Sequence, residues 1–219
     1  MGHRPWQYKA IVSTKDQNPV VVDAFQRFRK RLFVDRLGWR LSIKDDRECD
    51  QFDTSAAIYC VLFRSDELVG GFRAIRTDQE YLAQSVFSNL ATLRPFPRRR
   101  DVWEISRFGV LANVSRMDAA KMNYGVMLRF AHERQASALV ALVDLAHERF
   151  LGSVGIRTRR YGPPQTIGTN LMGRTIQGVA GEIPLTEQSG ERYRSLIADA
   201  QHVEVHDETM AVGRSRVSA

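Results

Sequence analysis

The feature that most constrains the fold of this chain is a set of charged residues inside otherwise apolar segments. Arg29 interrupts an apolar stripe of helical spacing, Arg73 lies within the run LVGGFRAI, and Glu104 lies within VWEISRFGVL. Burying an unpaired charge is costly, so these side chains must pair with opposite charges or face a polar pocket. The natural counter-charges are Asp50 and Asp53 in the run ECDQFD. For any one of these residues a structural ion pair is the simpler interpretation, whereas the five together favour a pocket.

Apolar runs and helical stripes alternate along the chain. Asn18 and Pro19 provide the capping side chain and first-turn proline of a helix that should end at Gly38. Ser115 and Asp118 form a capping-box-like start for a second helix, which should end near residue 135. Strands are predicted at residues 8–14, 56–63, 68–76, 102–111, 138–143, 156–161 and 175–183, further helices at 144–151 and 187–200, and a polar loop at 41–54.

This order of elements predicts an α/β domain with a mixed sheet and helices on its faces. The length of 219 residues and the apolar content of 43% fit one domain with a sizeable core. We expect that domain to span residues 1–205 and a polar, mobile tail to follow at 206–219.

The cysteine content indicates a reducing environment. Cys60 lies in an apolar run, and Cys49 lies among charged residues with no histidine nearby. We therefore expect neither a disulfide framework nor a metal site, and the cytoplasm is the expected location. The sequence also has no apolar segment long enough to span a bilayer and no signal-peptide pattern.

The chain is basic, with a net charge of +7 and a pI of about 9.8. Nucleic acid, an anionic membrane surface and an acidic carrier protein would all suit this charge. The densest basic run, RPFPRRR at residues 94–100, is broken by two prolines and is predicted to be a loop rather than a groove-binding helix. The aromatic residues lie in apolar runs instead of alternating with arginine, which disfavours a nucleic-acid-binding domain.

Five fragments form an ordered set along the chain. They are RKRLFVDRLGW with Arg29, Phe33 and Trp39; ECDQFDT with Asp50 and Asp53; GGFR with Gly71 and Arg73; Phe87; and WEISRF with Glu104, Ser106 and Arg107. This set resembles the acyl-homoserine-lactone synthase family of LuxI-type autoinducer synthases, from about residue 8 to about residue 185. The resemblance implies an N-acetyltransferase-like fold, a three-layer sandwich with a mostly antiparallel central sheet.

The resemblance also implies a reaction in two steps. An acyl thioester acylates the amine of S-adenosylmethionine, and the carboxylate then attacks its own γ-carbon, closing the lactone and expelling methylthioadenosine. The first step needs a base, because the amine is mostly protonated at neutral pH. Glu104 is the candidate base, directly or through a water, and on an extended strand Ser106 and Phe108 share its face. Without the resemblance, an ion pair of Glu104 with Arg107 or another arginine is the simpler interpretation.

A cationic sulfonium substrate needs carboxylates or aromatic faces around it, and its carboxylate needs a cation. The residues that the resemblance assigns to S-adenosylmethionine are Arg29, Phe33, Trp39, Asp50, Asp53 and Arg107. We also expect Asp50 and Asp53 to pair with Arg29 and Arg107. A role as ordinary core aromatics is an equal alternative for Phe33 and Trp39, and for Phe87 it is the simpler interpretation. No permanently bound cofactor is implied, since S-adenosylmethionine is a substrate.

The residues expected at the acyl-binding part of the site depart from the family pattern at two places. After Arg73, residues 74–77 read AIRT where the family often has leucine-leucine-proline-threonine. Ala141 occupies the position at which members that make 3-oxo-acyl products tend to carry threonine. The resemblance therefore favours a product without a 3-oxo group.

The acyl donor is expected to be an acyl carrier protein or acyl-CoA. The pyrophosphate-binding loop of N-acetyltransferases is missing after Val110, where the sequence reads LANVSRMDAAK, which argues against a standard acetyl-CoA enzyme. One basic cluster is either a docking patch for an acidic carrier or a solvated face, and consists of Arg149, Arg157, Arg159 and Arg160. The alternative enzyme is an acyl-CoA-dependent N-acyltransferase of similar fold that acts on another amine.

Overall fold

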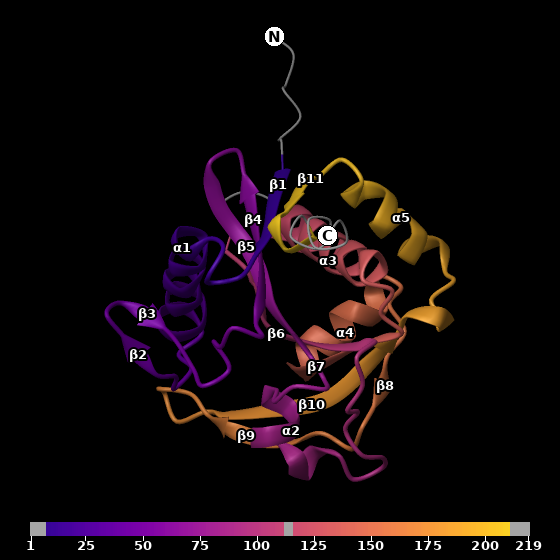
Figure 1. Cartoon of the computed structure of the whole chain (residues 1–219). Coiled ribbons are helices and arrows are strands. Elements are labelled where there is room, and N and C mark those ends of the chain that lie inside the picture. The colour runs from indigo at the N-terminus through magenta and orange to yellow at the C-terminus, as the bar shows by residue number, and fades with distance from the viewer. Residues whose placement is uncertain (1–7, 112–115, 211–219) are drawn as a thin grey trace, which may run out of the picture.

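A nine-stranded sheet forms the centre of the computed structural model, which describes residues 8–111 and 116–210 (Figure 1). The strand order is β11-β1-β4-β5-β6-β7-β10-β8, with β9 paired to β10. The β1–β11 and β6–β7 pairs are parallel and the other pairs are antiparallel, as expected for a mixed, mostly antiparallel sheet. The strands are β1 (Tyr8–Ser13), β4 (Ile58–Arg64), β5 (Glu67–Arg76), β6 (Val102–Val110), β7 (Ala138–Asp144), β8 (Arg159–Arg160), β9 (Gln165–Thr169), β10 (Thr175–Pro184) and β11 (Glu204–Asp207).

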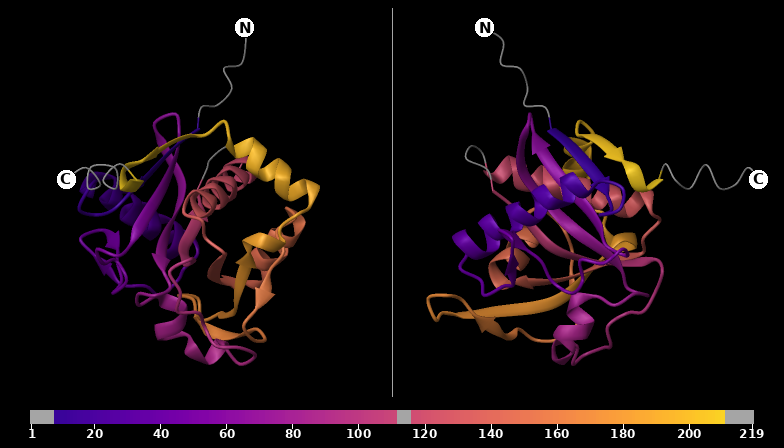
Figure 2. Two further views of the ribbon diagram at one scale, coloured as in Figure 1. Left: turned by 45° about the vertical axis from the view of Figure 1, so that its right-hand side comes forward. Right: turned by 60° about the vertical axis from the view of Figure 1, so that its left-hand side comes forward.

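Helices cover both faces of this sheet and give the expected three layers. Figure 2 shows α1 on one side of the strands and α3 and α5 on the other. The helices are α1 (Pro19–Arg29), α2 (Leu82–Val86), α3 (Arg116–Glu133), α4 (Leu145–Ser153) and α5 (Glu191–Ala200), with short 3₁₀ turns η2 (Ser88–Leu90) and η3 (Leu185–Glu187). Phe25 and Phe28 of α1 belong to one buried apolar cluster, whereas Leu128 of α3 and Leu196 of α5 belong to the other.

The first helix starts as predicted and then changes its geometry. The side chain of Asn18 accepts the N–H of Val21, and Pro19 occupies the first turn. After Arg29 the chain continues as a π-helix, η1 (Lys30–Arg36), and ends at Gly38, whose φ of +69° suits glycine. Short π-helical turns are frequent at functional sites, and here the turn precedes Trp39.

Strands β6 and β7 diverge in the middle of the sheet. Their parallel pairing covers only Val102 to Glu104 on β6. Beyond this point β6 contains a bulge, because Arg107 and Phe108 together oppose the single residue Phe72 of β5. Arg107 has a φ of +53°, in the left-handed region that a non-glycine residue rarely adopts. Residues packed on both faces of the sheet, such as Phe33 and Tyr124, line the space beside this divergence.

Several elements differ from the sequence-based predictions. The expected loop at 41–54 contains a two-stranded ribbon of β2 (Ile43–Lys44) and β3 (Arg47–Glu48), whose turn places Asp45 and Asp46 at positive φ. These two strands lie outside the central sheet, so they lack the apolar pattern from which a strand can be predicted. The predicted strand at 156–161 is reduced to β8, and β9 and α2 were not predicted.

The C-terminal boundary also differs. β11 pairs in parallel with β1 up to Asp207, so His206 and Asp207 belong to the sheet instead of the expected tail. The proposed cap at Ser115 lies outside the described residues. Within the described ranges, no helix combines the length and apolar character that crossing a bilayer requires.

Candidate active site

Three arginines and three carboxylates form one ion-pair network next to the sheet. The arginines come from α1, β5 and β6, and the carboxylates come from the segment that starts in β3. The members are Arg29, Arg73, Arg107, Glu48, Asp50 and Asp53. The numbers of opposite charges match, which is the condition under which such groups tolerate burial.

Arg29 is fully buried at the end of α1. Its Nε donates to Oε2 of Glu48 at 2.5 Å, and its Nη1 and Nη2 donate to the two oxygens of Asp53 at 2.6 and 3.0 Å. Glu48 also accepts hydrogen bonds from Nε and Nη2 of Arg107, at 3.0 and 2.9 Å. Glu48 therefore links α1 to β6. Glu48 was not among the site residues predicted from sequence, although it begins the acidic run that contains Asp50.

Arg73 connects the rest of the network to strand β6. Its Nη1 and Nη2 donate to the two oxygens of Asp50 at 2.5 and 3.1 Å, and Nη1 also donates to Asp53 at 3.0 Å. The Nε of Arg73 donates to the hydroxyl oxygen of Ser106 at 3.1 Å. Nη2 of Arg107 lies 2.8 Å from Oδ2 of Asp50. The predicted pairing of both aspartates with arginines is therefore present, with Arg73 as an additional partner.

The network keeps both aspartates ionised. Burial alone would raise the pKa of Asp50, but the hydrogen bonds and charge of Arg73 outweigh burial and hold that pKa below its ordinary value. Burial likewise opposes the influence of Arg29 and Arg73 on Asp53, whose pKa is held well below its usual range. Asp50 thus presents a negative charge at neutral pH.

Glu104 is 1% exposed, and its carboxylate caps the short helix α2. Its Oε2 accepts the N–H of Leu82 at 3.0 Å, and its Oε1 accepts the N–H of Ala83 at 2.7 Å. Within the described ranges its carboxylate makes no ion pair at salt-bridge distance, in contrast to the simpler interpretation considered from sequence. Burial raises the pKa of Glu104, although the two backbone N–H groups and the charge of Arg73 act in the opposite direction. A buried carboxylate of raised pKa is a stronger base than an exposed one.

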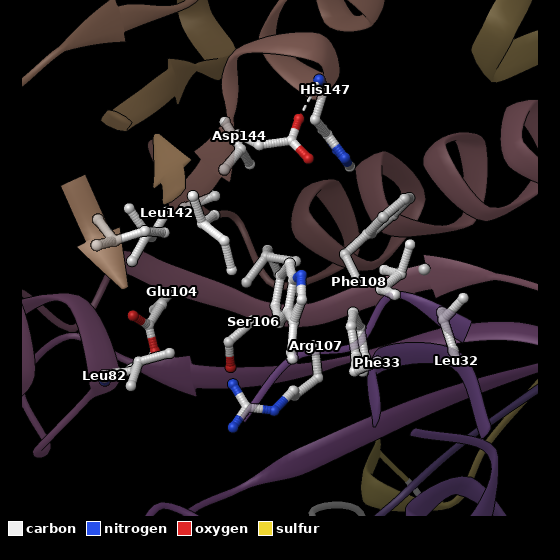
Figure 3. Close-up of a pocket in the computed structure, with 18 of the residues that line it drawn as sticks. Leu32, Phe33, Leu82, Glu104, Ser106, Arg107, Phe108, Leu142, Asp144 and His147 are labelled. Carbon is white, nitrogen blue, oxygen red and sulfur yellow. Dashed lines mark hydrogen bonds between the residues drawn. The ribbon is translucent and has the colours of Figure 1, made fainter. Parts of the chain in front are cut away.

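A cavity of about 770 Å³ lies where β6 and β7 diverge. Figure 3 shows Glu104, Ser106 and Arg107 on one side of it, and Asp144 and His147 on the opposite side. The predicted site residues that line the cavity are Phe33, Trp39, Asp50, Phe87, Glu104, Ser106, Arg107, Phe108 and Ala141. The structure therefore gathers residues from distant parts of the sequence around one space.

Three of the predicted site residues lie behind the cavity wall. Arg29, Asp53 and Arg73 belong to the ion-pair network but do not line the cavity. Their partners Asp50 and Arg107 do line it. The geometry thus gives the hidden residues a positioning role.

The prediction for Phe108 was wrong in one respect. Glu104 and Ser106 share a face of β6, but the bulge at Arg107 turns the following residue to the other face. There the ring of Phe108 lies 6.2 Å from Phe72 and 4.3 Å from Tyr124, between ring centroids. The alternation of side chains assumed for an extended strand does not continue through a left-handed residue. Phe108 still lines the cavity, on its opposite side.

The four arginines considered for docking are exposed on and near α4. Arg160 forms an ion pair with Glu148 at 2.6 Å, and Arg159 forms one with Glu187 at 2.5 Å. For Arg149 and Arg157, no ion pair is found within residues 8–111 and 116–210. Two of the four therefore have their charge already compensated.

Tyr124 and His147 also line the cavity, and neither was predicted from sequence as a site residue. The structure places Tyr124 in a core cluster as well as at the cavity wall. A histidine at the start of a helix gives no sign of this position, because the cavity arises only from the separation of two strands.

Comparison with known proteins identifies the family to which this chain is similar. Residues 13–186 match the family model described as autoinducer synthase. The acyl-homoserine-lactone synthase of Acinetobacter nosocomialis is 31% identical over 153 residues, which is 65% of this chain and 84% of that protein. The acyl-homoserine-lactone synthase of Pseudomonas aeruginosa is 32% identical over 167 residues, which is 75% of this chain and 79% of that protein.

Solved structures show the same fold. A crystal structure of TofI with an inhibitor and MTA is 27% identical, with a TM-score of 0.71 over 86% of this chain and 99% of that chain. A structure of BjaI, a CoA-dependent acyl-homoserine lactone synthase with SAM and isopentyl-CoA, has a TM-score of 0.80 at 18% identity, over 96% and 99% of the two chains. A putative N-acetyltransferase from Lactobacillus plantarum has a TM-score of 0.54 at 18% identity, over 82% of this chain and 99% of that chain, which agrees with the expected N-acetyltransferase-like fold. The chain therefore belongs to the autoinducer synthase family.

Proposed function

We propose that this chain is an acyl-homoserine-lactone synthase with S-adenosylmethionine as substrate. The amine nitrogen attacks the carbonyl carbon of an acyl thioester, forming an amide and releasing the thiol. A carboxylate oxygen then attacks the γ-carbon, breaking its bond to the sulfonium sulfur and releasing methylthioadenosine. The observation that carries this proposal is one cavity that combines the buried carboxylate of Glu104 with the ionised carboxylate of Asp50.

Glu104 acts in this proposal as the base for the first step. Each of its oxygens accepts one backbone N–H, which fixes the carboxylate and leaves each oxygen a second lone pair for a proton. Its raised pKa brings it closer to the pKa of the amine from which it takes a proton, directly or through a water. Ser106, on the same face of β6, is held by Arg73 and supplies a hydroxyl beside the reacting groups.

The substrate cation is proposed to bind between Asp50 and the rings of Phe33 and Trp39, whose centroids lie 5.1 Å apart. A sulfonium is stabilised by a carboxylate and by aromatic faces. Arg107 lines the same cavity and would pair with the carboxylate of the substrate. Arg29 and Asp53 hold these groups in place from behind the wall, as positioning residues.

For the donor we propose an acyl carrier protein, with acyl-CoA as the alternative. Arg149 and Arg157 are exposed near α4, and other residues of α4 line the cavity, so an acidic carrier bound there would lie next to it. Charge reversal at Arg149 and Arg157 should raise the KM for the acylated carrier while leaving the KM for S-adenosylmethionine unchanged. Equal KM values for the carrier in the variant and the parent would contradict docking at this patch.

The small residue Ala141 lines the part of the cavity assigned to the acyl group, and we propose a product without a 3-oxo group. Mass spectrometry of culture medium from cells that express the chain would identify the lactone.

The free thiols of Cys49 and Cys60 agree with a reducing compartment such as the cytoplasm.

The experiment that tests the reaction is incubation of the purified protein with S-adenosylmethionine and an acylated carrier protein. Release of methylthioadenosine together with an acyl-homoserine lactone is the expected result. Acyl transfer to another amine, without methylthioadenosine, would instead identify an N-acyltransferase of similar fold.

A further inference from the structure

The cavity contains a second polar location, on the side opposite Glu104. The hydroxyl of Tyr124, on α3, is paired with Nε2 of His147, on α4. Tyr124 is 2% exposed, and both residues line the cavity. Figure 3 shows His147 across the cavity from Glu104 and Ser106.

The surroundings of this pair are aromatic and apolar. The ring of Tyr124 lies 4.3 Å from that of Phe108 and 5.5 Å from that of Phe150, between centroids. The ring of His147 lies 5.6 Å from that of Phe108. The apolar lining around the pair includes Met127, Leu139, Leu151 and Ile183. A purely saturated acyl chain would need no polar atoms in such a wall.

The position of His147 is fixed by its helix. Asp144 caps α4, and its Oδ1 accepts the backbone N–H of His147 at 2.7 Å. This cap fixes the backbone from which the imidazole extends to the tyrosine hydroxyl. This arrangement keeps both polar groups oriented before any ligand binds.

The hydrogen bond within the pair leaves capacity for a ligand. A tyrosine hydroxyl that donates to an imidazole nitrogen still has a free lone pair on oxygen, and the second imidazole nitrogen still carries a proton. Burial raises the pKa of Tyr124 well above its ordinary value and lowers the pKa of His147, so both are neutral at neutral pH. A neutral pair suits a hydroxyl or carbonyl oxygen rather than an ionised group.

We propose that Tyr124 and His147 form a polar subsite that binds an oxygen atom carried by the acyl group and so selects hydroxylated or carbonyl-bearing acyl groups over saturated ones. This inference rests on the proposed function, because it assigns the cavity between β6 and β7 to the acyl group. It differs from recognition of a 3-oxo group by a threonine at position 141, which this chain lacks, because the subsite is built from α3 and α4 and not from β7.

The pantetheine arm of the donor carries the same chemistry, with amide and hydroxyl groups on a narrow chain. The near-complete burial of Tyr124 within a core cluster favours the acyl group, because a pantetheine arm must lead out to the carrier. The ratio of the kcat/KM values for two donors distinguishes binding of the acyl group from binding of the pantetheine arm. Donors with different acyl groups on the same carrier share their pantetheine, so its contribution cancels in the ratio of their kcat/KM values.

The test uses the full chain and acyl carrier protein loaded with a straight saturated acyl group or with hydroxylated forms of the same length, one carbon position at a time. The variants are Tyr124→Phe and His147→Leu, which remove the polar atoms, and Phe150→Leu, a control that changes only the apolar wall. The parent enzyme should prefer one hydroxylated donor by about tenfold in kcat/KM, the scale of one well-placed hydrogen bond. Tyr124→Phe should abolish that preference while retaining turnover of the saturated donor, and Phe150→Leu should retain the preference.

Each contrary result has a distinct meaning. A parent enzyme that makes lactone with no preference for any hydroxylated donor would overturn the subsite. A Tyr124→Phe variant that loses activity equally with all donors would assign the pair to pantetheine and overturn its role in acyl selection. Absence of lactone from every donor in the parent enzyme would instead contradict the proposed function.

Discussion

Glu48 accepts a hydrogen bond from Nε of Arg29 at 2.5 Å, and neither side chain is exposed to solvent. The same carboxylate accepts two hydrogen bonds from Arg107, which lines the cavity. A single carboxylate thus connects the end of α1 to the bulge of β6. The ion-pair network consequently links buried residues of the fold to residues that line the cavity.

Glu48→Gln should strongly destabilise the protein, because it leaves two arginines with one fewer buried counter-charge. Removing one partner from a buried ion pair costs about 3–5 kcal/mol. Chemical denaturation measures the free energy of unfolding. Glu133→Gln is the matched control, because its ion pair with Arg129 is half-exposed and should contribute about 0.5 kcal/mol or less. Equal effects of the two substitutions would refute the buried role of Glu48.

Asp50→Asn should raise the KM for S-adenosylmethionine more than Asp53→Asn does, and it should lower the stability of the fold less. Asp50 lines the cavity, and its side chain is 15% exposed, so the charge that faces the substrate is lost while the fold retains other ion pairs. Asp53→Asn should show the reverse balance, because Asp53 lies behind the wall. Steady-state kinetics and thermal unfolding of both variants measure the contrast. Identical profiles would contradict the division into ligand-facing and positioning residues.

The stability should depend on acid pH through Asp53. Its pKa in the folded protein lies well below that of the unfolded chain, which is about 3.9. A depressed folded pKa contributes stability that is fully present above the unfolded pKa and is lost as the pH falls toward the folded one. The difference in unfolding free energy between the parent and Asp53→Asn should therefore be constant near neutral pH and shrink below about pH 4. A difference that does not change with pH would show that Asp53 is not held ionised.

Much of the site was predictable from sequence because its charges violate the apolar pattern around them. Arg29, Arg73 and Glu104 were expected to be buried, and each is 0 or 1% exposed. Asp50 and Asp53 were expected to pair with arginines, and they do. The mixed, mostly antiparallel sheet followed in the same way from the apolar runs and the resemblance.

The remaining features depend on backbone geometry that side-chain patterns do not specify. The left-handed conformation of Arg107 moved Phe108 to the other face of β6. The cap of α2 by Glu104 required a helix that the polar composition of residues 77–88 did not reveal. Tyr124 and His147 line a cavity that lies where β6 and β7 diverge, and the sequence does not reveal this divergence.

In the proposed mechanism, Glu104 removes a proton from the substrate amine in the cavity. The direct measurement is single-turnover release of methylthioadenosine and lactone by Glu104→Gln, together with the Kd for S-adenosylmethionine. General bases contribute about 10²- to 10⁴-fold to rate, so the variant should bind the substrate normally and react at least about 100-fold more slowly. A variant that binds S-adenosylmethionine and reacts at nearly the parental rate would contradict the assignment of Glu104.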